Sequence, residues 1–84
     1  MDFYTSSCAP CKHMAPILDE AASKLSDVAF FKVNAQTNPE LAARFGIRSV
    51  PTFLVMVAGT VKGQKSGTMT VTQMQDWIVD CLRS

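Results

Sequence analysis

The sequence predicts an α/β protein, with a four-stranded mixed sheet and helices on its faces, formed by a single domain over residues 1–84. Three observations predict this class. Short apolar segments and amphipathic segments follow one another in the order strand, helix, strand, short helix, strand, strand, helix. A tight turn joins the last two strands, so one strand runs antiparallel to the others. A chain of 84 residues with 48% apolar residues also has room for one small core.

The N-terminal part of the chain predicts a strand followed by a long helix. Residues 1–5 (MDFYT) are apolar or aromatic except for Asp2, as in a short buried strand. An apolar period of 3.6 residues then predicts a helix over 9–26. Its apolar face consists of Met14, Ile17, Leu18, Ala21, Ala22 and Leu25. Pro10 suits the first turn of this helix, and Pro16 is expected to kink it because proline has no N–H.

The middle of the chain predicts a second strand and a short helix. The run 28–33 (VAFFKV) is rich in β-branched and aromatic residues, with Lys32 embedded in it. After a polar turn, residues 40–45 predict a short helix. Gly46 ends that helix, since glycine readily adopts the left-handed backbone conformation that is common there.

The C-terminal part predicts a β-hairpin and a final helix. Residues 53–57 are continuously apolar, as in a strand covered on both faces, whereas 61–66 are more polar, as at a sheet edge. Thr70 and Gln73 have the spacing of a capping box at a helix N-terminus. The helix that follows has an apolar face of Val71, Met74, Trp77, Ile78, Cys81 and Leu82. Cys81 is expected to be a buried apolar residue there.

Charge and composition exclude several classes of function. Eight Lys and Arg against seven Asp and Glu give a formal net charge of +1, so the chain lacks the basic surface that binds nucleic acid or an anionic membrane. The sequence contains no apolar run of membrane-spanning length and no signal-peptide pattern. Three cysteines cannot all pair within one chain, which argues against a disulfide-stapled secreted scaffold. We therefore expect a reducing, cytoplasmic location.

Two of the cysteines, Cys8 and Cys11, lie where the first strand meets the long helix. A cysteine pair at i and i+3 in this position is typical of a redox-active dithiol. The free N–H groups and the dipole at a helix N-terminus stabilise a thiolate. We expect Cys8 to lie beside solvent as the thiolate that attacks a substrate disulfide. Cys11, expected to be more buried, would then resolve the mixed disulfide.

The same cysteine pair also occurs as half of a zinc site. Zinc needs four ligands, usually in two separated pairs, and the remaining candidates are His13 and Cys81. Because Cys81 falls on an apolar helical face, we predict no metal site. A purely structural disulfide is less favoured still, because a loop of this length restrains little chain entropy.

Two longer segments resemble the thioredoxin family. The segment DFYTSSCAPCKHMAPILDEAA resembles the active-site strand, motif and kinked helix of that family, and IRSVPTFLV resembles its cis-proline segment. The spacing agrees from Asp2 to the final helix. The resemblance implies a thioredoxin-like fold and a protein-disulfide reductase. It implies no cofactor beyond a redox-active Cys8–Cys11 disulfide, with a reductase or glutathione as the electron donor.

The resemblance also implies roles for individual residues. Asp2 matches the buried aspartate that moves a proton to and from the resolving thiol, and Lys32 matches the lysine near it. Val50 matches the residue that pairs with an extended substrate, and Pro51 the cis-proline that faces the disulfide. The other substrate-binding candidates are Ala9, Pro10 and Gly67.

The residues themselves leave some of these roles open. An aspartate in an apolar strand is expected to have a raised pKa, because burial disfavours its charged form, but Asp2 lies one residue from the terminus and a solvated side chain also fits. Lys32 also fits a charge that protects an edge strand. Pro51 also fits an ordinary proline at the start of a strand.

The chain departs from the family pattern in two places. The strand and helix that usually precede the first segment are absent from this sequence. We therefore expect 28–33 to be an exposed edge strand beside uncovered apolar sheet surface, and the protein to self-associate there or to be marginally stable. Ser7 stands where the family usually has tryptophan, which puts recognition by an ordinary reductase in doubt. Two alternative functions remain, a thioredoxin-shaped binding module with an incidental dithiol and a glutaredoxin-like enzyme that uses glutathione.

Overall fold

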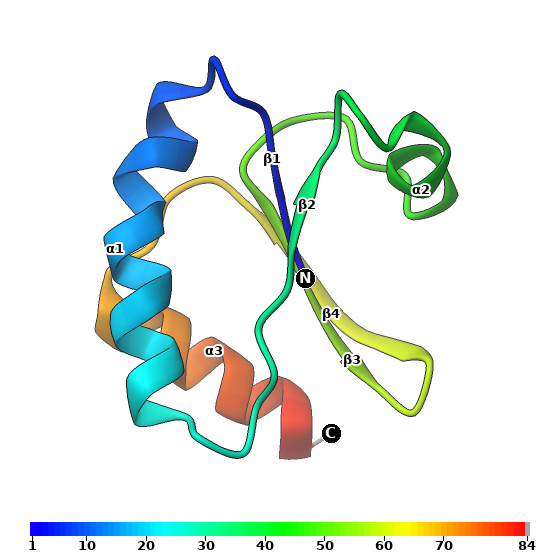
Figure 1. The fold of residues 1–84 in the computed structure, drawn as a ribbon. Coiled ribbons are helices and arrows are strands. Elements are labelled where there is room, and N and C mark those ends of the chain that lie inside the picture. The colour runs from blue at the N-terminus through cyan, green and yellow to red at the C-terminus, as the bar shows by residue number, and fades with distance from the viewer. Residues whose placement is uncertain (84) are drawn as a thin grey trace.

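The computed structural model describes residues 1–83. Within them, four strands and three helices follow one another along the chain (Figure 1). They are β1 (Asp2–Tyr4), α1 (Ala9–Lys24), β2 (Lys32–Asn34), α2 (Pro39–Arg44), β3 (Thr52–Val57), β4 (Thr60–Ser66) and α3 (Val71–Arg83). The predicted order of elements and the α/β class are thereby confirmed. None of the helices within residues 1–83 combines the length and apolarity needed to cross a membrane.

The four strands form one mixed sheet in the order β2-β1-β3-β4. β1 runs parallel to β2, with Asp2 opposite Lys32. It runs antiparallel to β3, with Asp2 opposite Phe53. β3 and β4 form the antiparallel hairpin. Only β3 therefore runs against the other strands, as the sequence predicted, and β4 is an edge strand.

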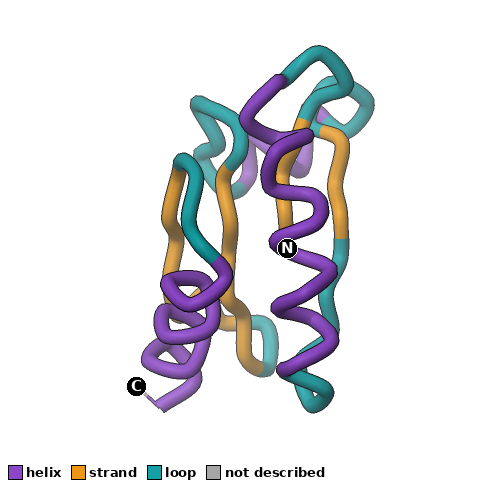
Figure 2. The backbone as a smooth tube through the Cα atoms, turned by 90° about the vertical axis from the view of Figure 1, so that its left-hand side faces the viewer, coloured by secondary structure: helices purple, strands orange, loops and turns teal. Residues whose placement is uncertain are grey.

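Helices cover both faces of the sheet. α1 and α3 pack together on one face, and α2 lies on the other (Figures 1 and 2). The larger core fills the space between α1, α3 and the sheet, with buried side chains of Met14, Leu18, Ala21, Phe53, Val55, Met69, Met74, Ile78 and Cys81. A smaller cluster, built on Phe3, Ala42 and Leu54, lies on the face of α2. The thinly covered face is therefore the one that carries α2.

Several local signals end or start elements as predicted. The Gln73 N–H donates to Thr70 Oγ1 at 3.1 Å, and the Thr70 N–H donates to Gln73 Oε1 at 2.9 Å, which completes the capping box of α3. Gly46, just after α2, has a φ of +66°. Ala58 and Gly59 both have positive φ, as the tight turn between β3 and β4 requires.

The strand predicted over 28–33 is wrong in its first part. β2 covers only Lys32–Asn34, and residues 28–31 lie outside the sheet. Asp2, the first residue of β1, lies opposite Lys32, so no strand within residues 1–83 lies beside residues 28–31. Phe31 is 63% exposed. β2 is nevertheless an edge of the sheet, as expected.

Candidate active site

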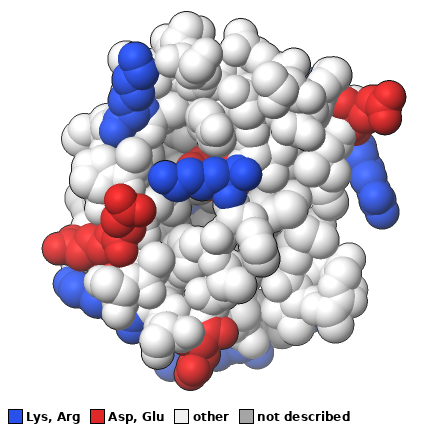
Figure 3. All heavy atoms as spheres, viewed as in Figure 1, with Lys and Arg blue, Asp and Glu red and all other residues white. Residues whose placement is uncertain are grey.

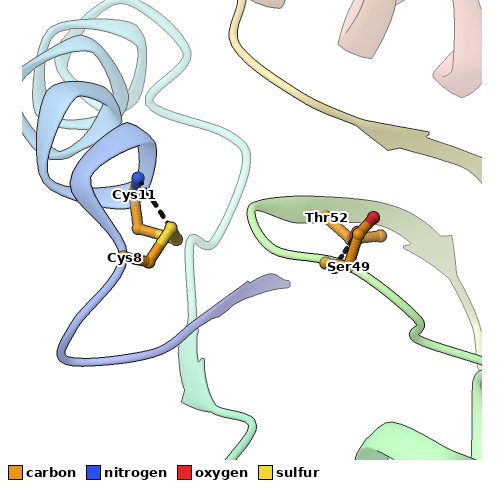
Figure 4. Close-up of a disulfide and its surroundings, with 4 residues drawn as sticks. All are labelled: Cys8, Cys11, Ser49 and Thr52. Carbon is orange, nitrogen blue, oxygen red and sulfur yellow. Dashed lines mark hydrogen bonds between the residues drawn. A yellow bond between two sulfur atoms is a disulfide. The ribbon is translucent and has the colours of Figure 1, made fainter.

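The dithiol lies at the N-terminus of α1 (Figure 4). Cys8 is the N-cap residue and Cys11 lies in the first turn, and the two form a disulfide with their Cα atoms 5.2 Å apart. The Cys11 N–H donates to Cys8 Sγ at 3.1 Å. The Cys8 sulfur therefore accepts one of the N–H groups that a helix N-terminus leaves free. A donor in this position favours the thiolate over the thiol once the disulfide is reduced.

Cys8 is more buried than we predicted. Its exposed fraction is 8%, the same as that of Cys11, whereas the sequence favoured an exposed Cys8 and a more buried Cys11. The reason is that the Cys8 side chain turns inward over the first helical turn, toward the Cys11 N–H. The residues around it, Ser7, Ala9 and Pro10, are exposed. The disulfide thus lies just below a rim of small side chains.

A loop between Ser49 and Thr52 faces the disulfide (Figure 4). Thr52 Oγ1 donates to the Ser49 carbonyl at 2.6 Å and lies 2.9 Å from Ser66 Oγ on β4. The Gly67 N–H donates to the Pro51 carbonyl at 2.9 Å. These hydrogen bonds fix both ends of the loop opposite the cysteines.

The loop contains the residues for which the resemblance implied substrate binding. The Val50–Pro51 peptide bond is cis, as expected, and Pro51 is buried while Val50 is half-buried. Gly67, which follows β4, has a φ of +95°, a conformation that residues with side chains rarely adopt. The substrate-binding roles of these residues, and of Ala9 and Pro10, stay predictions.

Asp2 is buried in β1 beside Lys32. Its exposed fraction is 9%, and its Oδ1 accepts no hydrogen bond from any group within residues 1–83. Burial raises the pKa of Asp2, and the charges of Lys32 and of the N-terminal ammonium oppose this. The raised pKa expected from the sequence is confirmed, and the solvated side chain is not observed. Lys32 itself is exposed on the edge strand, so its catalytic role stays a prediction.

The third cysteine, Cys81, is buried in the larger core, as predicted. Burial and the charge of Asp80 raise the pKa of its thiol, against the opposing charge of Lys65. Within residues 1–83, no three His, Cys, Asp or Glu side chains gather as a metal ion would require. Sequence reasoning missed Gly63 on β4, where a Cβ would collide with Cys81 Sγ. The sequence feature that could have revealed this contact is a glycine inside a predicted strand, which often indicates close packing.

A dithiol at a helix N-terminus, facing a cis-proline loop on an α/β sheet, is the arrangement of a thiol–disulfide oxidoreductase. The family model described as Thioredoxin matches residues 1–80. The chain therefore belongs to the thioredoxin family, whose members are protein-disulfide oxidoreductases, and it is an enzyme of this class.

Known relatives agree with this assignment. The chain is 38% identical over 79 residues to the thioredoxin of Rickettsia prowazekii, covering 93% of this chain and 75% of the relative. It resembles the crystal structure of thioredoxin NaTrxh from Nicotiana alata with a TM-score of 0.88 and 29% identity, over 94% of this chain and 68% of that one.

A further solved structure concerns the thiol resolving mechanism in yeast mitochondrial 1-Cys peroxiredoxin via glutathione/thioredoxin systems. It matches this chain with a TM-score of 0.87 and 30% identity, over 94% of this chain and 74% of that one. These three matches thus cover nearly all of this chain but only about two thirds to three quarters of each relative.

Proposed function

We propose that the protein reduces disulfide bonds of protein substrates with the Cys8–Cys11 dithiol alone, without a metal or organic cofactor. The observation that carries the proposal is the hydrogen bond from the Cys11 N–H to Cys8 Sγ at the N-terminus of α1. It supports Cys8 as the attacking sulfur, because the donor stabilises negative charge on that atom. Cys11, in the first turn of the helix, is the resolving sulfur.

The cycle has two exchange steps. The Cys8 thiolate attacks one sulfur of the substrate disulfide, the substrate S–S bond breaks, and the departing sulfur takes up a proton. Cys11 then loses its proton and attacks Cys8 Sγ, which breaks the bond between Cys8 and the substrate and releases the second substrate thiol. The substrate has gained two electrons and two protons, and the protein is left with the Cys8–Cys11 disulfide. A donor must return two electrons and one proton, which restores the Cys8 thiolate and the Cys11 thiol.

We assign supporting roles to four further residues. The Asp2 carboxylate accepts the Cys11 proton, directly or through water, since its raised pKa makes it a stronger base than an ordinary aspartate. Lys32 limits that rise in pKa through its charge. Val50 pairs its backbone with an extended substrate, and Pro51 packs against the substrate disulfide.

The electron donor that we propose is a reductase or glutathione, in a reducing cytoplasm, where the protein would serve electron transport and redox homeostasis. The yeast structure connects a protein of this fold with both glutathione and thioredoxin systems, which supports testing both donors. The comparison is between NADPH with thioredoxin reductase and NADPH with glutathione and glutathione reductase. A preference for glutathione would favour the glutaredoxin-like alternative.

The test of the proposal is insulin reduction with dithiothreitol as the donor. The wild-type protein should accelerate insulin precipitation, and Cys8→Ser should reduce the rate to that of dithiothreitol alone. Cys81→Ala is the matched control, because it removes a cysteine outside the dithiol and should keep the wild-type rate. Full activity of Cys8→Ser would refute the mechanism. A wild-type protein that binds a partner but does not reduce insulin would favour the binding-module alternative.

We also propose that the outer edge of β2 and the neighbouring residues 28–31 mediate self-association. The exposed Phe31 side chain on an edge of the sheet supports this. Sedimentation at several protein concentrations should show a dimer at high concentration. A stable monomer that binds no hydrophobic dye would contradict the proposal.

A further inference from the structure

The two halves of the candidate active site come from segments far apart in the sequence. The dithiol is carried by the start of α1, whereas the facing loop between Ser49 and Thr52 leads into β3 (Figure 4). In the proposed mechanism, a substrate disulfide lies between them, with Cys8 Sγ on one side and Pro51 on the other. The separation of the two halves therefore decides how well an extended substrate is held.

The loop is joined to residues 67–69, which follow β4. The Gly67 N–H donates to the Pro51 carbonyl at 2.9 Å, so the loop and this segment share a backbone hydrogen bond. Met69, at the end of the segment, is buried, with an exposed fraction of 5%. The position of the segment relative to α1 thus influences the position of the loop relative to the dithiol.

A sulfur atom of α1 binds this segment directly. The Met69 N–H donates to Met14 Sδ at 3.4 Å, across 55 positions of the chain. Met14 lies one helical turn after Cys11 and is fully buried. Because Met69 precedes Thr70, where the capping box of α3 begins, its N–H lies outside the hydrogen bonds of that helix. The thioether therefore supplies the acceptor that a buried N–H needs.

The identity of the side chain at position 14 matters for this contact. Leucine or isoleucine would fill a similar volume of the larger core, but neither carries an acceptor, and a buried N–H without a partner is costly. Methionine fills the core and accepts a weak hydrogen bond with the same side chain. The contact therefore adds to apolar packing, because it holds one backbone position after β4 against the part of α1 that carries Cys11.

Charge gives little support for substrate binding on the face of the molecule shown in Figure 3. Basic and acidic side chains are interspersed there, and the chain as a whole has a formal net charge of +1. A substrate that approaches this face therefore meets no field of one sign. Steering by charge is weak, and the fit of the substrate between the dithiol and the loop becomes the larger contribution to affinity.

We propose that Met14 is a positioning residue for disulfide reduction. By accepting the Met69 N–H, its sulfur holds residues 67–69, and with them the cis-proline loop, at a fixed distance from the dithiol. The proposal rests on the proposed function, since the loop positions a substrate only if the dithiol reduces one. Met14 is buried, so it acts through the loop: it governs the affinity for extended substrates and leaves the reactivity of Cys8 unchanged.

The test exchanges Met14 for leucine, which keeps the apolar volume and removes the acceptor. Cores tolerate this exchange well, so the variant should fold. Met14→Leu should raise the KM for insulin at least about threefold and change kcat less than about twofold, because the loop affects binding rather than the exchange step. Initial rates of insulin reduction at several insulin concentrations, with dithiothreitol as the donor and corrected for dithiothreitol alone, give both constants.

Met74→Leu is the matched control, because it makes the same exchange in the same core. Met74 is 1% exposed, and its sulfur meets no backbone donor within residues 1–83. This variant should keep the wild-type KM. A small disulfide provides a second control, since it does not need the loop. Reduced Met14→Leu, freed of dithiothreitol, should react with hydroxyethyl disulfide at the wild-type rate, measured by mass spectrometry after acid quenching.

Hydrogen exchange tests the contact itself. The Met69 amide should exchange at least about tenfold faster in Met14→Leu than in the wild type, because its acceptor is gone. Met74→Leu should leave the exchange of this amide unchanged. The Met74 amide, which donates to the Thr70 carbonyl at 2.9 Å, is the internal reference, and its unchanged exchange in Met14→Leu would show that α3 remains folded.

Three results would overturn the positioning role while leaving the proposed function intact. They are an unchanged KM in Met14→Leu, an equal rise in KM in Met74→Leu, and unchanged exchange of the Met69 amide in Met14→Leu. A wild-type protein that reacts with hydroxyethyl disulfide but does not reduce insulin would instead overturn both the positioning role and the proposed function.

Discussion

The two ends of β1 differ in how completely their polar groups are paired. At the end that leads to the dithiol, Cys8 Sγ, the Thr52 hydroxyl and the Gly67 N–H all form hydrogen bonds. At the other end, Asp2 Oδ1 accepts no hydrogen bond within residues 1–83, and the Phe31 N–H bonds to no described backbone group. Within residues 1–83, the polar groups around the dithiol are thus paired, whereas Asp2 Oδ1 and the Phe31 N–H at the opposite end, which we call the open end, are not.

The comparison indicates that the chemistry of the dithiol depends on a small part of the fold. The dithiol needs the start of α1 and the loop before β3, both of which local hydrogen bonds hold in place. The open end affects stability instead, because it contains the buried carboxylate of Asp2 and the exposed side chain of Phe31. Substitutions at the two ends should therefore separate activity from stability.

The largest stability difference should appear between two methionines. Met14 is fully buried one helical turn after Cys11, and its sulfur accepts from the Met69 N–H at 3.4 Å. Met14→Ala should lower the free energy of unfolding by about 2–5 kcal/mol, because it leaves a cavity behind the dithiol. Met56→Ala, at the half-buried open end, is the control and should cost less than half as much. Equal losses in urea denaturation would show that the two ends are equally packed.

Removing the buried charge of Asp2 should stabilise the protein at neutral pH. A folded-state pKa above the unfolded value of about 3.9 means that the folded protein binds this proton more tightly. Stability therefore falls as the pH rises from that value through the folded pKa, and stays low above it. Asp2→Asn should raise the free energy of unfolding by about 1–3 kcal/mol at pH 7, and the gain should disappear below about pH 4.

The exposed Asp19 gives the matched control for this measurement, since Asp19→Asn removes a carboxylate that solvent already reaches. Its unfolding free energy should show no such pH-dependent gain in urea titrations between pH 3 and pH 8. If Asp2→Asn were less stable than the wild type at pH 7, the charged carboxylate of Asp2 would have to be stabilised by groups that the structure does not pair with it.

The capping box of α3 should contribute a smaller amount. Thr70→Ala removes the oxygen that accepts from the Gln73 N–H and should cost about 1 kcal/mol. Thr72→Ala lies within α3 at an exposed position and should be neutral or slightly stabilising. Thermal unfolding of both variants checks this, and identical melting temperatures would rule out a stabilising cap.

The smallest stability effect is expected at Phe31. Because this side chain is 63% exposed, Phe31→Ser should change the free energy of unfolding by less than about 0.5 kcal/mol. It should nevertheless reduce hydrophobic dye binding and self-association. Phe30→Ser, which removes a side chain packed against the larger core, should destabilise the protein more. A large loss of stability in Phe31→Ser would contradict the exposed position of the Phe31 side chain.

Signals that act within a few residues were sufficient to predict most of the fold. The cysteine spacing, the Thr70–Gln73 capping box and Gly46 each define a helix end through contacts with near neighbours. The strand over 28–33 was predicted too long because strand pairing depends on a distant partner. Residues 28–31 have strand-like composition, but β1 reaches only as far as the position opposite Lys32.

The parts of the site that the sequence did not predict depend on the direction and packing of side chains. The burial of Cys8 follows from the inward turn of its sulfur toward the Cys11 N–H, which residue type alone does not specify. The role of Gly63 depends on the approach of Cys81 from another element.

The most direct test of the central claim is to trap the mixed disulfide. Cys11→Ser should be incubated with a peptide that contains one intramolecular disulfide, and the product analysed by mass spectrometry after proteolysis. We predict one covalent peptide adduct on Cys8, and none in the Cys8→Ser, Cys11→Ser double variant, which retains Cys81. An adduct on Cys81, or no adduct while the wild-type protein still reduces the peptide, would contradict attack by Cys8.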